Sequence, residues 1–181
     1  KVIDSLAEIE PGEWNALSRN DPFLQHGFFH GLEKTGCLQP QGWYQQHLVA
    51  LEKGTLVGAL PLFVRDNSYG EFVFDWSWAD AYERAGGRYY PKLVTAVPFS
   101  PVMGQRLLLD ETHPAALDIT NNLVKAARDA CDNSGFSSWH CLFPLESEMA
   151  TLENEGLLTR LGCQYHWFND DYRDFDDFLS R

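Results

Sequence analysis

The stretch Ser68–Tyr82 reads SYGEFVFDWSWADAY, and aromatic rings occupy every second position from Phe72 to Trp78. Alternation with period two predicts a β-strand whose side chains point to opposite faces. One face of this predicted strand, residues 71–77, carries the four rings, and the other carries Glu71, Val73, Asp75 and Ser77. Asp75 and Ser77 would lie about 7 Å apart on that second face. We expect Phe72 and Phe74 to pack in the core and the acidic face to line a substrate cleft.

The segments on either side of this stretch extend the sheet. Runs of apolar residues at 47–51 and 56–60 are joined by a turn containing Gly54, which predicts an antiparallel hairpin. With residues 71–77 they would form a three-stranded meander. Residues 93–109 also look extended but are interrupted by Pro98, Pro101 and Gly104. Because proline cannot donate to a β-ladder, we expect this strand to be bent, bulged or partly unpaired.

The two ends of the chain add helices and further strands. Residues 2–9 are expected to be extended, and two short helices follow, one beginning at Pro11 and one ending at Gly36. The last third alternates: a long helix ending at Gly135, a strand at 136–143, a helix at 146–161, a strand at 164–168 and the start of a further helix from Tyr172. Antiparallel strands followed by alternating strands and helices predict a mixed α/β layer architecture.

Length and charge limit the function. The 181 residues suit one domain, 1–181, and they carry 14 basic and 26 acidic residues, a net charge of −12. Such a surface repels phosphate backbones, so we expect no non-specific nucleic-acid binding. The apolar runs are too short to span a bilayer, and the first residues do not form a signal peptide, so we expect a cytoplasmic protein without a membrane span.

The four cysteines form no CxxC pair, and we expect free thiols and no metal site. The chain begins without Met and ends within a helical pattern at Ser180 and Arg181, so we expect a fragment of a longer protein.

The predicted order of elements resembles that of the GNAT acyltransferase fold, with the interrupted strand at the position of the GNAT bulge. More specifically, the chain from about Trp14 to Leu179 resembles bacterial Fem-like proteins, which are labelled peptidoglycan biosynthesis or recognition proteins or N-acyltransferases. Four strings carry this resemblance: SYGEFVFDWSWADAY, RYYPKLVTAVPFSPVMGQRLL, SSWHCLFP and QYHWFNDDY.

The resemblance implies a GNAT-like mixed sheet with helices on both faces. It also implies that the chain is the first half of a two-half protein, with a second GNAT-like half as its partner and residues 170–181 as the start of a truncated helix. The reaction it implies is transfer of an acyl or aminoacyl group to an amine of a peptide or cell-wall precursor. The donor stays open between an acyl-CoA and an aminoacyl-tRNA.

One departure from the GNAT pattern concerns coenzyme A. GNAT enzymes present a glycine-rich loop to the pyrophosphate of the cofactor, where backbone N–H groups and a helix N-terminus bind the anion. The corresponding region here, residues 103–109, contains a single glycine, Gly104. We therefore expect that this half does not bind coenzyme A through the usual loop.

N-acyl transfer needs a base that takes a proton from the amine, and Asp75 and His140 are our candidate catalytic residues. Asp75 could instead face solvent, and His140 could be a core residue of its strand. Candidate substrate-binding residues are the polar Ser77 and Asp80, the amphipathic rings Trp78, Tyr82 and Tyr90, the cations Lys92 and Arg106, and His166. For these, helix capping, core packing and surface ion pairs are the alternatives.

Three functions follow from these candidates. The first is a cytoplasmic N-acyl or aminoacyl transferase, of which this half alone could be inactive. The second is a module that binds a cell-wall peptide or precursor without catalysis. The third is a structural half that supports a partner domain.

Overall fold

The computed structural model describes residues 1–180, and its strands form two four-stranded sheets, ordered β1-β3-β4-β7 and β2-β5-β6-β8. The strands are β1 (Val2–Ile3), β2 (Trp43–Gln45), β3 (His47–Glu52), β4 (Thr55–Leu60), β5 (Phe63–Arg65), β6 (Lys92–Thr95), β7 (Leu108–Leu109) and β8 (Trp139–Cys141). One residue separates β2 from β3, and two separate β4 from β5, so a long hairpin runs through both sheets. All pairs are antiparallel except β6 with β8, which is parallel.

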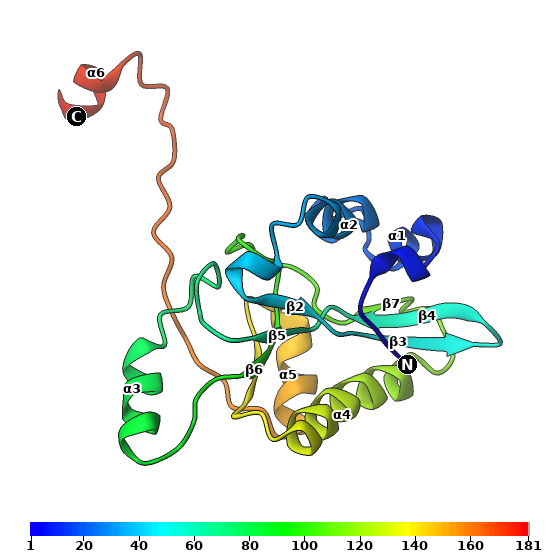
Figure 1. Cartoon of the computed structure of the whole chain (residues 1–181). Helices are drawn as coiled ribbons and strands as arrows, with labels where there is room; N and C mark the ends of the chain where they lie inside the picture. Colours follow the sequence, from blue (N-terminus) through cyan, green and yellow to red (C-terminus); the bar gives the residue numbers. More distant parts are fainter. Residues whose placement is uncertain (181) are drawn as a thin grey trace.

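Helices cover both faces of the sheets, as the sequence predicts (Figure 1). The short turn η1 (Leu6–Glu8) leads into α1 (Pro11–Leu17) and α2 (His26–Lys34) on one side, and η2 (Gln39–Gln41) leads into β2. The long α4 (Ala116–Ser134) and α5 (Glu146–Asn154) lie on the other side. Each side has its own apolar core, one around Trp14, Phe29 and Phe63, the other around Leu60, Leu93 and Val124.

The expected interruption of the 93–109 strand is confirmed. β6 pairs with β5, and β7 pairs with β4, yet residues 96–107 lie between β6 and β7 while only Pro61 and Leu62 lie between β4 and β5. The surplus residues must leave the ladder, which is the bulge that the two prolines predict.

The strand predicted at 71–77 is wrong. Residues 71–75 have no regular structure, and α3 (Trp76–Arg84) begins directly after Asp75. The backbone turns twice before that, since Gly70 has φ 78° and Phe72 has φ 57°. The alternation of acidic and aromatic residues corresponds to an alternation of burial within an irregular loop. Glu71 and Asp75 are buried, whereas Phe72 and Phe74 are exposed. The third strand beside the hairpin is instead supplied by β6 and β7.

The end of the chain also differs from the prediction. The helix expected to reach residue 161 ends at Asn154, and the strand expected at 164–168 is an exposed segment without regular structure. That segment runs away from the sheets towards α6 (Phe175–Ser180), the described part of the expected C-terminal helix (Figure 1). Arg181 lies outside the described residues. A strand needs a neighbouring strand to pair its backbone groups, and none runs beside residues 164–168 among the first 180 residues.

Candidate functional site

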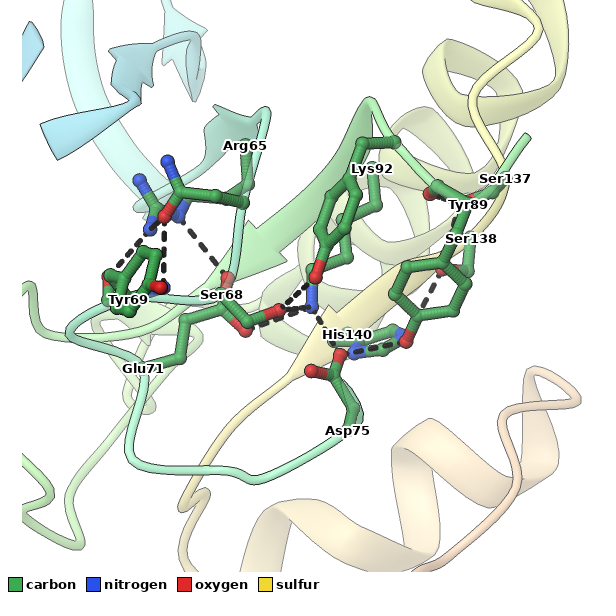
Figure 2. A network of polar contacts seen from close by, with 12 residues as sticks. Arg65, Ser68, Tyr69, Glu71, Asp75, Tyr89, Lys92, Ser137, Ser138 and His140 are labelled. Atoms are coloured by element: carbon green, nitrogen blue, oxygen red, sulfur yellow. Dashed lines mark hydrogen bonds and ion pairs between the residues drawn. The ribbon is translucent and has the colours of Figure 1, made fainter. Parts of the chain in front are cut away.

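Lys92, the first residue of β6, is the centre of a buried polar network (Figure 2). Its ammonium group donates hydrogen bonds to Ser68 Oγ at 3.0 Å, Glu71 Oε2 at 2.8 Å and Asp75 Oδ2 at 2.6 Å. An ammonium has three donor hydrogens, so these bonds use all of them. The three acceptors belong to the irregular residues 68–75, which we call the 68–75 loop. Lys92 therefore fastens this loop to the sheet.

Arg65 lies beside Lys92 on the neighbouring strand, because the two residues are partners in the β5–β6 register. Its Nε donates to Glu71 Oε1 at 3.2 Å, and its guanidinium lies 3.8 Å from the centroid of the Trp43 ring. Its two terminal nitrogens donate to Gln41 O, Asn67 Oδ1 and Tyr69 O. Two cations thus face two carboxylates, Glu71 and Asp75, in an electrically balanced cluster, which is the condition for burying charges at acceptable cost.

Tyr89 links this cluster to His140. Its hydroxyl donates to Asp75 Oδ2 at 2.7 Å, and its ring centroid lies 6.3 Å from that of His140 in β8. His140 Nε2 shares a 3.0 Å hydrogen bond with Ser138 Oγ. The fold therefore brings the two candidate catalytic residues, Asp75 and His140, next to the same tyrosine. Asp75 Oδ1 accepts no hydrogen bond from the described residues and keeps an unused acceptor position.

The pKa values of the network follow from burial and hydrogen bonding. Burial raises the pKa of Asp75, but hydrogen bonds from Lys92 and Tyr89 outweigh it and hold that pKa below its usual value. Burial raises the pKa of Glu71 by more than its two cationic partners lower it. Burial and the bond to Asp75 raise the pKa of Tyr89. Burial and, to a smaller extent, the charge of Lys92 lower the pKa of His140 to about 4, although the charge of Asp75 acts in the opposite direction. At neutral pH Asp75 is ionised, Tyr89 keeps its proton and His140 is uncharged.

The aromatic side chains of the 68–75 loop and α3 face outward. Six of them are 46–68 % exposed and form what we call the aromatic face: Tyr69, Phe72, Phe74, Trp76, Trp78 and Tyr82. Phe72 and Phe74, which the sequence analysis assigns to the core, belong to this surface. The guanidinium of Arg160 lies 5.4 Å from the centroid of the Trp78 ring. Exposed apolar surface of this extent is typical of binding surfaces.

The other candidate residues divide between the network and the surface. Tyr90 joins the network through a 2.8 Å hydrogen bond between its hydroxyl and Ser68 Oγ. Ser77 and Asp80 lie exposed on α3, where Asp80 pairs with Arg84 at 2.7 Å.

Tyr82 belongs to the aromatic face, and its ring contacts the ring of Tyr89 edge-on, with 6.1 Å between the centroids. His166 lies in the extended segment near the end of the chain, where its Nε2 is 3.2 Å from Gln164 Oε1.

Arg106 lies in the bulge, buried and apart from the Lys92 network. Its guanidinium donates to three backbone carbonyls: Leu142 O at 2.7 Å, Gln105 O at 3.0 Å and Val102 O at 2.6 Å. The backbone N–H groups of Arg106, Leu107 and Leu145 donate to the carboxylate of Glu148. An internal carboxylate therefore occupies the amide donors of this part of the bulge.

Coenzyme A does not fit the loop between β7 and α4. β7 ends at Leu109 and α4 begins at Ala116, so the loop comprises residues 110–115, later than the sequence analysis places it. It contains no glycine, Pro114 lacks an N–H group, and the N–H of Thr112 already donates to Asp110 Oδ1 at 2.9 Å. Asp110 and Glu111 would also repel a pyrophosphate. The anion-binding amides that the cofactor needs are missing here.

Four residues of the network were not among the candidate catalytic or binding residues, namely Arg65, Ser68, Glu71 and Tyr89, although Glu71 was placed on the acidic face. The i, i+4 spacing of Glu71 and Asp75 within an aromatic run is a signal that could have found Glu71, because buried acids need cationic partners. No cluster of three or more potential metal ligands occurs within residues 1–180. None of the helices described is long and apolar enough to cross a membrane.

Comparison with known proteins identifies the family. A family model described as peptidoglycan biosynthesis/recognition, FemAB-like, matches residues 5–181. The chain belongs to the FemAB-like family. The aromatic face, the Lys92 network and the bulge all lie inside the matched region. None of the curated protein sequences is significantly similar to this FemAB-like chain.

Solved structures confirm the GNAT-like fold. An aminoglycoside 6'-N-acetyltransferase from Acinetobacter haemolyticus is 12 % identical, with a TM-score of 0.52 over 94 % of this chain and 98 % of that chain. A Trypanosoma brucei acetyltransferase is 12 % identical, with a TM-score of 0.51 over 93 % and 97 %. An acetyltransferase from Agrobacterium tumefaciens is 15 % identical, with a TM-score of 0.52 over 92 % and 99 %. At these identities the likeness concerns the fold.

Proposed function

We propose that this FemAB-like chain is a domain of an N-acyl or aminoacyl transferase that modifies an amine of a peptide or cell-wall precursor. The observation that carries the proposal is the family match over residues 5–181. The bulge between β6 and β7 supports it, since it interrupts the sheet where acyltransferases of this fold place their substrates. The proposal locates the reaction in the cytoplasm and includes a second GNAT-like half as the partner of this one.

In this proposal His140 accepts the proton of the attacking amine, and Asp75 acts indirectly through Tyr89. An amine must lose a proton as the new amide bond forms, and the uncharged imidazole of His140 can accept one, as a weak base because its pKa is about 4. Asp75 is too deeply buried to touch a substrate directly, because its side chain is 1 % exposed. Its role would be to accept the hydrogen bond from the Tyr89 hydroxyl. That bond would fix the Tyr89 ring, which contacts the ring of His140.

A recognition module without catalysis is the second candidate, and one observation favours it. The network is closed, since Lys92 uses all its donors on protein acceptors and has no exposed side-chain surface. The exposed part of this region is the aromatic face, and rings with polar tips suit a peptide or sugar ligand. In that case Lys92, Glu71 and Asp75 would only shape the surface that binds.

Three substitutions separate these functions. The protein and its variants would be incubated with labelled acyl-CoA or aminoacyl-tRNA and a cell-wall precursor peptide, and product formation and peptide binding would be measured. A transferase loses turnover in Asp75→Asn and His140→Gln while it still binds the peptide. A binding module loses peptide affinity in Trp78→Ala and is little changed by Asp75→Asn.

Thermal unfolding of each variant shows whether a loss reflects misfolding. Absence of any product with either donor, in a folded protein that binds the peptide, would contradict the transferase proposal. A change in stability alone, in all three variants, would support the structural role.

A further inference from the structure

A surface groove of about 650 Å³ lies between α1, the first residues of β4 and the loop that joins β7 to α4. None of its lining residues belongs to the Lys92 network or to the aromatic face. Figure 1 places α1, β4 and β7 at the opposite side of the molecule from α3. The groove is therefore a separate feature, and neither role assigned above makes use of it.

The floor of the groove is apolar. Leu17 of α1 and Leu56 of β4 lie beneath it and are almost completely buried, and Val57 and Leu109 are half-buried. Ala16 lies on its exposed margin. A floor of aliphatic side chains suits a flexible hydrocarbon chain, from which it would remove water.

The rim of the groove is acidic. Glu13, Asp110 and Glu111 line it together with a single arginine, Arg19, which forms an ion pair with Glu111. Counting these four residues, and counting His113, which also lines the groove, as neutral, the rim carries a net charge of −2. Within the described part of the chain, no ion pair neutralises Glu13 or Asp110.

Asp110 is held in a fixed orientation. The N–H and the hydroxyl of Thr112 both donate to Asp110 Oδ1, at 2.9 and 2.6 Å, and these bonds hold the pKa of Asp110 below its usual value. Asp110 is therefore an ionised carboxylate at neutral pH. Its other oxygen, Oδ2, receives no hydrogen bond from residues 1–180 and is left to accept one from a ligand.

We propose that this groove binds the aliphatic ammonium side chain of a lysine in a peptide. The methylene chain would lie over Leu17, Leu56 and Leu109, and the ammonium would reach Glu13 and Asp110. Long cationic side chains place apolar stems on apolar surface and keep the charge at its edge, which is the arrangement of floor and rim here. The same rim repels phosphates and carboxylates. The inference goes beyond the proposed function, because it requires binding of the peptide and no transfer step.

Three short peptides that differ at one position test the proposal: one with lysine, one with norleucine and one with Nε-acetyl-lysine. Binding would be followed by NMR on the ¹⁵N-labelled protein without any acyl donor, which measures weak affinity and maps the site. We expect the lysine peptide to shift the amides of Ala16, Val57 and Leu109 and to bind at least threefold more tightly than the other two. Its affinity should fall as salt rises from about 0.05 to 0.5 M.

Variants of the rim give the decisive comparison. Glu13→Gln and Asp110→Asn should each weaken lysine-peptide binding by about threefold, and together by about tenfold. Asp129→Asn removes the same charge from an exposed position of α4 outside the groove lining and should have no effect.

Equal affinity for the three peptides, shifts confined to the aromatic face, or unchanged binding in the double variant would overturn the proposal. Because no donor is present, such a failure says nothing about transfer. The transferase proposal fails by a different result, namely the absence of any product with either donor in the turnover assay.

Discussion

Replacing Lys92 by methionine removes the ammonium that Ser68, Glu71 and Asp75 share, while it keeps an unbranched side chain in place. The buried cluster then changes from two cations and two carboxylates to one cation, Arg65, and two carboxylates. Glu71 keeps its bond to Arg65, but Asp75 keeps only the Tyr89 hydroxyl. Removing one partner of a buried ion pair costs about 3–5 kcal/mol, because the other charge stays behind without compensation.

The loss is measurable by urea denaturation followed by tryptophan fluorescence, and by thermal unfolding. In a domain of this size about 1 kcal/mol corresponds to roughly 2–4 °C, so Lys92→Met should lower Tm by about 6–20 °C. Lys125→Met is the matched control, since Lys125 lies exposed on α4 and should change stability by no more than about 0.5 kcal/mol.

A double-mutant cycle isolates the charge effect. Asp75→Asn in the Lys92→Met background removes the uncompensated carboxylate, so the double variant should lose about 1–3 kcal/mol less than the sum of the single losses. The reasoning is refuted if Lys92→Met costs no more than Lys125→Met, or if the two losses simply add. If Lys92→Met does not fold, recovery of folding in the double variant shows equally that the uncompensated carboxylate of Asp75 caused the loss.

Three further predictions concern other buried contacts. Glu148→Ala leaves three backbone N–H groups without their acceptor and should lower the free energy of unfolding in urea by about 2–4 kcal/mol, with a smaller loss in Glu148→Gln. Burial lowers the pKa of His47 from 6.5 to about 4. As pH falls, the unfolded chain therefore takes up a proton at this histidine before the folded chain does. The free energy of unfolding is unaffected above pH 6.5 and falls by up to about 3 kcal/mol by pH 4. His140 adds a similar fall, and His47→Asn should flatten the pH profile of unfolding; an unchanged slope would contradict this. A Cβ on Gly58 would lie 2.6 Å from Ile119 of α4, so Gly58→Ala should lower Tm by several degrees, and an equal Tm would show that α4 can move aside.

Local patterns predicted much of the fold. The hairpin of β3 and β4 follows from two apolar runs separated by a turn with Gly54, and its pairing is observed. The interruption between β6 and β7 follows from Pro98 and Pro101, since a missing N–H prevents pairing in any tertiary context. The helices of the last third follow from periodicity and glycine stops, although α5 ends earlier than its pattern indicates.

The candidate site was predicted only in part. Asp75, Tyr90, Lys92 and His140 do come together around Tyr89. Ser77, Trp78 and Asp80 instead lie exposed on α3, and Arg106 pairs elsewhere. A period-two pattern states that neighbours face opposite ways, but it does not state which face is buried. Lys92 and Arg65 decided that question, because their buried charges draw the two carboxylates inward.

The sequence by itself determined the class of fold, the place where the sheet is interrupted and the family, because hydrophobic periodicity, proline positions and motif strings are local properties of the chain. Only the tertiary structure decided that the 68–75 loop turns its acids inward and its rings outward, and that Glu148 fills the amide donors of the bulge. Those outcomes depend on charges far apart in sequence, and burial makes each charge require a partner that only the folded chain supplies.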